Sequence, residues 1–176
     1  MVATPGARPP ASPDKATLLV IRPSAIPLAV VGTVVELPNG QVDRPRFVGE
    51  NESTSYFYSP VPAGEHTFAV CGNGSAALRA TVAPGRVYVV EVDMTGLDVS
   101  FVPIKLREEQ WPLVRAWLAK SKAMIADTAS GQASVQNEVR GCIEDVRLTK
   151  NAAIPILASD DGVPTEEFMR QVFGPR

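Results

Sequence analysis

Residues 61–94, VPAGEHTFAVCGNGSAALRATVAPGRVYVVEVDM, decide the fold class of this chain. The stretch holds short runs rich in Val, Ala, Thr, Phe and Tyr, and breaks containing Pro or Gly separate them. In the first run His66, Phe68 and Val70 share one face, and in the last run every second residue from Tyr88 to Met94 is apolar. This period of two is typical of β-strands, in which successive side chains point to opposite faces. The stretch therefore predicts consecutive strands that bury one face in a core.

The same pattern extends over residues 16–104, where short β-prone runs alternate with turn signals. The breaks Pro38-Asn39-Gly40, Pro62-Ala63-Gly64 and Pro84-Gly85 supply residues that tolerate positive φ, so the strands should connect locally through hairpins. We expect a mainly β fold, an antiparallel sandwich. Its strands are predicted at residues 16–22, 28–37, 42–48, 54–58, 66–71, 77–82, 87–94 and 99–104.

After Lys105 the apolar residues recur at spacings of three and four, which is typical of a helix that buries one side. The pattern predicts an amphipathic helix over residues 111–125. Trp111 and Trp117 should anchor this helix on the sandwich, because burial of an indole ring removes a large apolar area from water. Two shorter helices are predicted after it, one over residues 135–146 that follows the breaker Ser130-Gly131, and one that begins at Thr165.

Residues 1–15, MVATPGARPPASPDK, show no apolar periodicity and are predicted to form a flexible tether. The chain then divides into the tether, a sandwich domain at residues 16–104 and a helical C-terminal extension at residues 105–176. The tether lacks the apolar run of an export signal. We expect that such a signal has been removed; a cytoplasmic protein with a disordered N-terminus is the alternative.

The composition excludes some classes of partner. With 176 residues and 45% hydrophobic content, the chain can bury a continuous core without a metal or cofactor, and we expect none. A formal net charge of −2 gives no basic surface for the phosphates of nucleic acid. The uncharged stretch at residues 23–35 carries two prolines and is far shorter than the roughly 20 residues of a transmembrane helix.

The two cysteines, Cys71 and Cys142, match no metal-ligand spacing, because zinc sites usually use closely spaced pairs. A disulfide between them fits an exported protein, and two buried free thiols fit a cytoplasmic one. The sequence leaves both readings open.

The segments Val61-Pro62-Ala63-Gly64-Glu65-His66-Thr67-Phe68 and Val82-Ala83-Pro84-Gly85-Arg86-Val87-Tyr88-Val89-Val90 resemble bacterial envelope domains of the PEGA type. The chain resembles still more closely a related lipoprotein family of unknown function, in which a strand opens with Arg-Pro, here Arg22-Pro23. The similarity covers roughly residues 16–103. It implies an immunoglobulin-like or transthyretin-like sandwich in a periplasmic or cell-surface protein that is usually non-catalytic. It transfers no catalytic residues to this chain.

His66 is the only histidine, so any triad, dyad or two-histidine metal site must include it. Its position after a Pro-x-Gly turn, on the face of Phe68 and Val70, predicts a structural ring that bonds a turn carbonyl. The run Gly72-Asn73-Gly74-Ser75 lacks the lysine and helix of a phosphate loop and is read as a hairpin turn. Asp160-Asp161-Gly162 lacks the alternating oxygen ligands of a calcium loop. We therefore expect no catalytic residue and no metal site.

Tyr56 and Tyr58 flank Phe57, so both hydroxyls should lie on the face opposite Phe57. They are candidates for stacking on a sugar or a peptide, although tyrosines at the rim of a half-buried sheet give the same pattern. The sequence as a whole favours a non-catalytic envelope module that binds or scaffolds a protein or a cell-wall component. The alternatives are a homo-oligomeric structural protein and a small-ligand carrier with a pocket between sandwich and helices.

Overall fold

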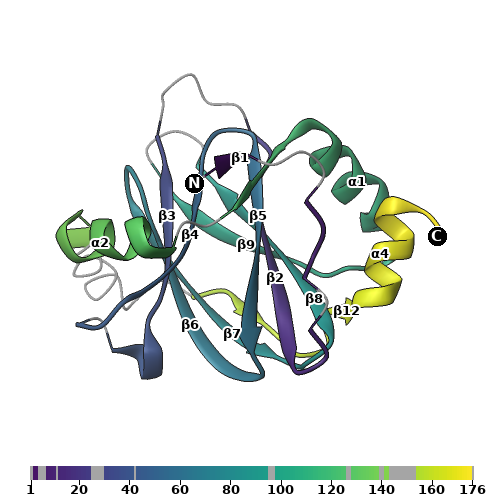
Figure 1. The fold of residues 1–176 in the computed structure, drawn as a ribbon, viewed down its shortest axis with the longest axis horizontal. Coiled ribbons are helices and arrows are strands. Elements are labelled where there is room, and N and C mark those ends of the chain that lie inside the picture. Colours follow the sequence, from purple (N-terminus) through teal and green to yellow (C-terminus); the bar gives the residue numbers. More distant parts are fainter. Residues whose placement is uncertain are drawn as a thin grey trace.

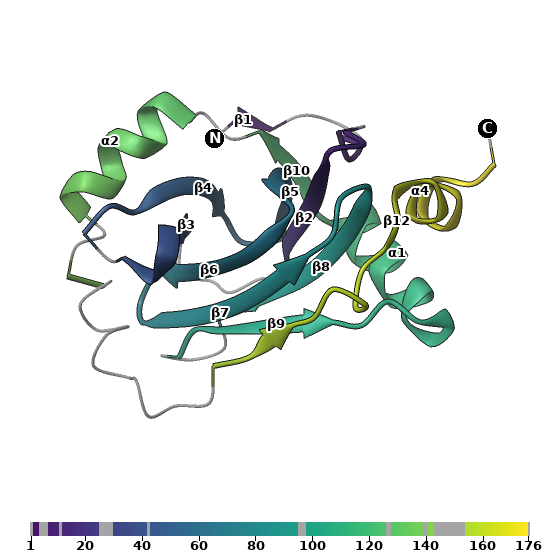
Figure 2. The same cartoon turned by 90° about the horizontal axis from the view of Figure 1, so that it is seen from below.

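The computed structural model describes residues 2–3, 7–10, 12–24, 30–41, 43–94, 98–125, 128–138, 141–142 and 154–175. Two mixed β-sheets pack face to face, with one helix on the outer side of one sheet and two helices on the outer side of the other (Figures 1 and 2). The prediction of a mainly β, sandwich-like fold with short helices is confirmed. Among the described residues no helix is both long and apolar enough to cross a membrane.

The first sheet is built around β2 (Lys15–Arg22). It pairs antiparallel with β5 (Ser55–Pro62) and parallel with β8 (Arg86–Asp93). Both faces of β2 are buried, which explains its continuous apolar run Leu18 to Ile21. The sheet is completed by the shorter strands β1 (Val2–Ala3), β10 (Lys122–Ile125), β9 (Ser100–Ile104) and β12 (Val163–Pro164).

The second sheet has the strand order β11 (Ile156–Leu157), β7 (Ser75–Val82), β6 (Gly64–Cys71), β3 (Gly32–Glu36), β4 (Arg46–Asn51). Its strands β3, β4, β6 and β7 are antiparallel neighbours. The predicted turn Pro38-Asn39-Gly40 lies between the paired strands β3 and β4, but the hairpins predicted at Pro62-Ala63-Gly64 and Pro84-Gly85 are wrong, because these breaks lead from one sheet to the other. The short helix η1 (Pro38–Gly40) forms the turn between β3 and β4, with positive φ at Asn39 (54°) and Gly40 (69°).

All eight strands predicted over residues 16–104 are present, although some ends differ. For example, β4 begins at Arg46 rather than at residue 42, and residues 28–29 of the second predicted strand lie outside the described residues. The prediction that all strands run antiparallel is wrong, because β8 is parallel to β2. The chain between β2 and β8 forms most of the second sheet, and this long connection permits a parallel pair.

The main core fills the space between the two sheets. It contains side chains from alternate positions of each strand, such as Leu18 and Val20 of β2 and Phe68 and Val70 of β6. This is the face that the period-two pattern of residues 61–94 indicated.

A second core lies between the outer face of the first sheet and the helices α1 (Trp111–Lys120) and α4 (Thr165–Phe173). Trp111 is 5% exposed and packs edge-on to Phe168, with 6.0 Å between the ring centroids. Trp117 packs against the same cluster but is only partly buried. The predicted docking of this helix on the sandwich is therefore confirmed, with Trp111 as the deeper anchor.

The predicted helix over residues 111–125 is too long. It ends at Lys120, and the next residues form β10, which runs parallel to β5. In β10, Met124 joins the main core and Ala123 joins the second core, so the two residues face opposite sides of the sheet. The backbone N–H and C=O groups at the outer edge of β5 form hydrogen bonds with β10, and they would lack these partners if residues 122–125 continued the helix.

The prediction of a helix break at Ser130-Gly131 is wrong, since both residues lie inside α2 (Thr128–Glu138). Gly131 lacks a side chain, and this allows the helix to approach Phe47; a Cβ at this position would be 2.3 Å from the ring. Within the predicted range 135–146, residues 135–138 form the end of α2 and residues 141–142 are helical, while residues 139–140 and 143–146 lie outside the described residues.

The N-terminal segment and the C-terminal extension both contribute to the sheets. Val2 and Ala3 pair with Ile125 and Met124 of β10, and Ala7 packs against the second core. The described part of residues 1–15 thus differs from the predicted free tether, because the open edge of β10 gives it a partner. Likewise, β10, β11 and β12 come from residues beyond 104, so the predicted boundary does not separate two structural units.

Candidate functional site

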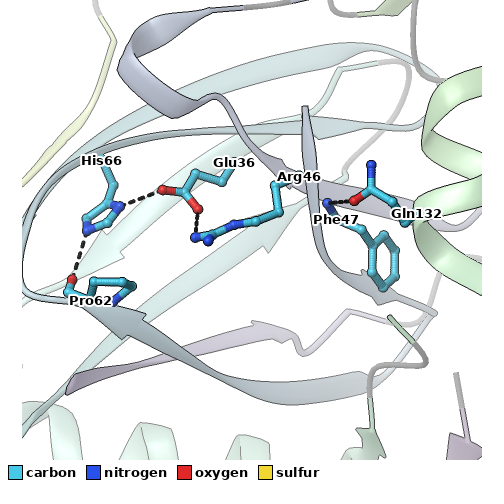
Figure 3. Close-up of polar contacts among 6 residues, drawn as sticks. All are labelled: Glu36, Arg46, Phe47, Pro62, His66 and Gln132. Carbon is cyan, nitrogen blue, oxygen red and sulfur yellow. Dashed lines mark hydrogen bonds and ion pairs between the residues drawn. The ribbon is translucent and has the colours of Figure 1, made fainter. Parts of the chain in front are cut away.

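The one histidine lies in a small charged cluster at the end of the main core (Figure 3). Its Nδ1 is 2.7 Å from Oε1 of Glu36, and its Nε2 is 2.8 Å from the backbone oxygen of Pro62. Oε2 of Glu36 forms an ion pair with Arg46. The ring stacks on Phe68 at 5.8 Å between centroids. The predicted structural role of His66, bonding a turn carbonyl and packing its ring, matches this geometry.

The strand register brings these side chains together. Glu36 is paired with Arg46 across β3 and β4, and with Phe68 across β3 and β6. Because side chains alternate along a strand, Glu36 shares the inward face of Val34, and His66 shares that of Phe68. The cluster therefore closes one end of the space between the sheets. The sequence signal for this cluster is the charged residue at an inward position of β3, and the predicted site residues did not include it.

Hydrogen bonding limits the chemistry of His66. A carboxylate oxygen and a backbone carbonyl oxygen can only accept hydrogen bonds, so both contacts are satisfied only when each ring nitrogen donates. The side chains of His66 and Glu36 are each 8% exposed, which leaves little access for a substrate. Protein groups engage both ring nitrogens, so neither is free in this geometry to take a proton from a substrate. The geometry favours a structural cluster over a catalytic one.

Tyr56 and Tyr58 lie on the face opposite Phe57, as predicted, but helices cover that face. Tyr56 is 4% exposed and its hydroxyl donates to the backbone oxygen of Ala7, 3.4 Å away. Tyr58 packs edge-on to Phe168 of α4. Burial, and then the charge of Tyr56, raise the pKa of Tyr58. The two rings therefore belong to the second core instead of forming an exposed stacking platform.

Cys71 and Cys142 are joined in a disulfide, with 5.8 Å between their Cα atoms. The bond links the end of β6 to the chain just after α2. Cys71 is buried with Val35, Phe47 and other residues in a third core cluster between α2 and the outer face of the second sheet. Of the two readings that the sequence left open, the disulfide is the one present, and it is consistent with an oxidising, extracytoplasmic compartment.

The helix α2 covers the open edge of β4 (Figure 3). The backbone N–H of Phe47 donates to Oε1 of Gln132, and Nε2 of Gln132 donates to the backbone oxygen of Pro45, each at 3.0 Å. One side-chain amide thus satisfies a donor and an acceptor that a neighbouring strand would otherwise pair. No sequence pattern pointed to Gln132, since its partner is far away in the chain.

The part of the second sheet that α2 leaves open carries a groove of about 600 Å³. Its floor is formed by the cross-strand pairs Glu65–Thr81 and Thr67–Arg79 of β6 and β7. Asn39 and Gly40 of η1 form one wall, and Ile156 of β11 forms another. Ile156 is 64% exposed, which is unusual for a large apolar side chain. The groove thus combines one carboxylate, one guanidinium, two hydroxyls and an apolar wall.

A second cleft, of about 660 Å³, lies along α4. Arg8 and Arg170 line it together with Glu166, Met169 and Phe173. The guanidinium of Arg8 lies 5.1 Å from the centroid of the Phe173 ring, so this arginine already has an aromatic partner.

Internal contacts hold the two loops that were compared with calcium and phosphate loops, Asp160-Asp161-Gly162 and Gly72-Asn73-Gly74-Ser75. Asp161 accepts a hydrogen bond from the backbone N–H of Ala158 at 2.8 Å and pairs with Lys105 at 3.1 Å. The N–H of Gly72 donates to the backbone oxygen of Gly74, as in a tight turn. Within the described ranges, no three acidic, histidine or cysteine side chains are grouped so as to hold a metal ion.

Comparison with known proteins adds no relative: no protein-family model matches the chain, and no curated protein matches it either.

Proposed function

We propose that this chain is a non-catalytic binding module of an oxidising compartment outside the cytoplasm, as in the bacterial cell envelope. The disulfide supports a location in an oxidising compartment. The resemblance of residues 61–68 and 82–90 to PEGA-type domains supports a location in the bacterial cell envelope. That resemblance, together with the two-sheet arrangement, also supports an immunoglobulin-like or transthyretin-like architecture for the sandwich. The double engagement of the His66 ring supports a non-catalytic role.

The observation that carries the proposal is the groove between η1 and β11. Glu65 and Arg79 offer opposite charges, Thr67 and Thr81 offer hydroxyls, and Ile156 offers an exposed apolar contact. A few polar groups beside an apolar surface suit a ligand that has both polar and apolar parts. An extended protein segment or a peptide-bearing cell-wall polymer has this chemistry. By contrast, side chains of the second core fill the space between sandwich and helices, where a carrier pocket was the alternative.

The test is photo-cross-linking in cells that export the chain. A photoreactive residue replaces Ile156 at the wall of the groove, and in a matched control it replaces Leu113, which is 41% exposed on α1. We expect a discrete adduct from position 156 that Arg79→Glu abolishes, and no such adduct from position 113. The charge reversal at Arg79 changes an exposed side chain, so the fold should be retained.

The mass of the adduct separates the remaining readings. An adduct that contains a different protein or a cell-wall fragment supports the binding module. An adduct with twice the mass of the chain supports the homo-oligomeric alternative. Equal labelling from positions 156 and 113, or an adduct that survives Arg79→Glu, would show that the groove is not the binding surface.

A further inference from the structure

Among its described side chains, the helix α2 buries little apolar surface. Its described buried residues are Val135, which is 1% exposed, and Gly131, which packs on Phe47. Ala129 and Ala133 are exposed. An isolated helix of this size is marginal in water, so its position depends on tertiary contacts. These contacts include the close approach to Phe47, the two hydrogen bonds of Gln132 and the Cys71–Cys142 disulfide beyond the end of the helix.

The disulfide is the covalent part of this attachment. It closes a loop with a sequence separation of 71 residues, so it keeps α2 near the second sheet even when the weaker contacts open. Without it, the noncovalent contacts of α2 alone must offset the entropy of ordering the whole helix. The main and second cores share no disulfide, and their strands are paired along most of their length.

We propose that the Cys71–Cys142 disulfide is a redox-sensitive latch that keeps α2 over the edge of β4, and that its reduction releases α2 without unfolding the sandwich. The reductant is a dithiol. One of its thiolates attacks a sulfur of the disulfide to form a mixed disulfide, and its second thiol then displaces that sulfur. Cys71 and Cys142 end as two thiols, and the dithiol ends as a disulfide. Cys142 is partly exposed, which gives the reductant access.

Release of α2 uncovers two features together. The N–H of Phe47 and the carbonyl of Pro45 lose their side-chain partner, so the edge of β4 becomes an open strand edge. The apolar side chains of the third core cluster, including Val35 and Phe47, become accessible to solvent. The reduced form therefore differs from the oxidised form in one sheet edge and one outer sheet face.

The test is hydrogen exchange of backbone amides, measured by NMR on the full chain before and after reduction by dithiothreitol, with the thiols then blocked. The amide of Phe47 reports on α2, and the amide of Val20 in β2 reports on the sandwich. We expect exchange at Phe47 to rise at least about tenfold on reduction, and exchange at Val20 to stay within about twofold. This change corresponds to about 1.4 kcal/mol or more of local opening.

Gln132→Ala is the matched variant, because it removes the partner of the Phe47 amide and leaves the disulfide intact. It should raise exchange at Phe47 in the oxidised chain. If exchange at Phe47 is unchanged by reduction, the disulfide does not hold α2. If reduction raises exchange at Val20 as much as at Phe47, the bond stabilises the whole fold and is no latch. If Gln132→Ala leaves Phe47 protected, the contact on which the proposal rests is absent.

Discussion

At the scale of single residues, the buried charges matter most. Glu36 lies between the ring of His66 and the guanidinium of Arg46, and its side chain is 8% exposed. Taking a charge out of water is costly unless partners satisfy it, so the buried carboxylate of Glu36 depends on His66 and Arg46. The cluster therefore stabilises the end of the main core only while it is complete.

His66→Gln should lower the free energy of unfolding by about 1–3 kcal/mol, because it removes a charge-assisted hydrogen bond to a buried carboxylate. Denaturant unfolding near pH 6 measures the loss. Glu65→Gln is the control, since Glu65 is an exposed neighbour whose replacement should cost less than about 0.5 kcal/mol. Equal values for the two variants would mean that His66 does not hold the cluster together.

Glu91 of β8 predicts a pH dependence. Burial and then the charge of Asp93 raise the pKa of Glu91 above its ordinary value. A carboxyl group with a raised pKa in the folded state stabilises the fold below its unfolded pKa, and this contribution is lost as pH rises through the folded pKa. Glu91→Gln should thus stabilise the protein near pH 7, and the gain should vanish below about pH 4. A gain that is independent of pH, measured by urea unfolding, would contradict the burial of this charge.

At the scale of elements, the apolar side of the amphipathic helix α1 packs against the outer face of the first sheet. Trp111→Ala should destabilise the fold by about 3–5 kcal/mol, because the indole is 5% exposed within the second core. Trp117→Ala should cost less, since that ring is partly buried, and Leu113→Ala should be nearly neutral. Denaturant unfolding ranks the three variants. A larger loss at Trp117 than at Trp111 would mean that α1 docks through a different face.

The N-terminal segment offers a second test at this scale. Deletion of residues 1–10 removes β1 from β10 and Ala7 from the second core, and it uncovers the hydroxyl of Tyr56. We expect a loss of about 1 kcal/mol or more, which lowers the melting temperature of a chain of this size by about 2–4 °C. An unchanged melting temperature in a calorimetric scan would restore the interpretation of a free tether.

The elements also show what a sequence can and cannot predict. The eight strands were predictable because period-two patterns and Pro-Gly turns are local signals. The strand β10 was missed since Ala123-Met124 fits a helical pattern as well, and only the edge of β5 decides the outcome. The parallel pairing of β2 with β8, the Gln132 contact and the groove walls at Gly40 and Ile156 depend on distant segments, for which one sequence gives no signal.

At the scale of the whole molecule, the fold consists of two packed sheets with α2 on one outer side and α1 with α4 on the other (Figure 1). The two helical sides differ in how they are attached. The helices α1 and α4 rest on a continuous apolar core, whereas α2 rests on a small cluster and a disulfide. The disulfide is therefore the feature on which both the compartment and the proposed latch depend.

The most direct test is the state of the two cysteines in the protein isolated from its own cells under denaturing conditions that trap free thiols. Mass spectrometry of a digest reports that state. The predicted result is one peptide pair that carries Cys71 linked to Cys142, with neither cysteine alkylated until a reductant is added. Alkylation of both cysteines without reductant would contradict the assignment of this chain to an oxidising compartment and the latch with it.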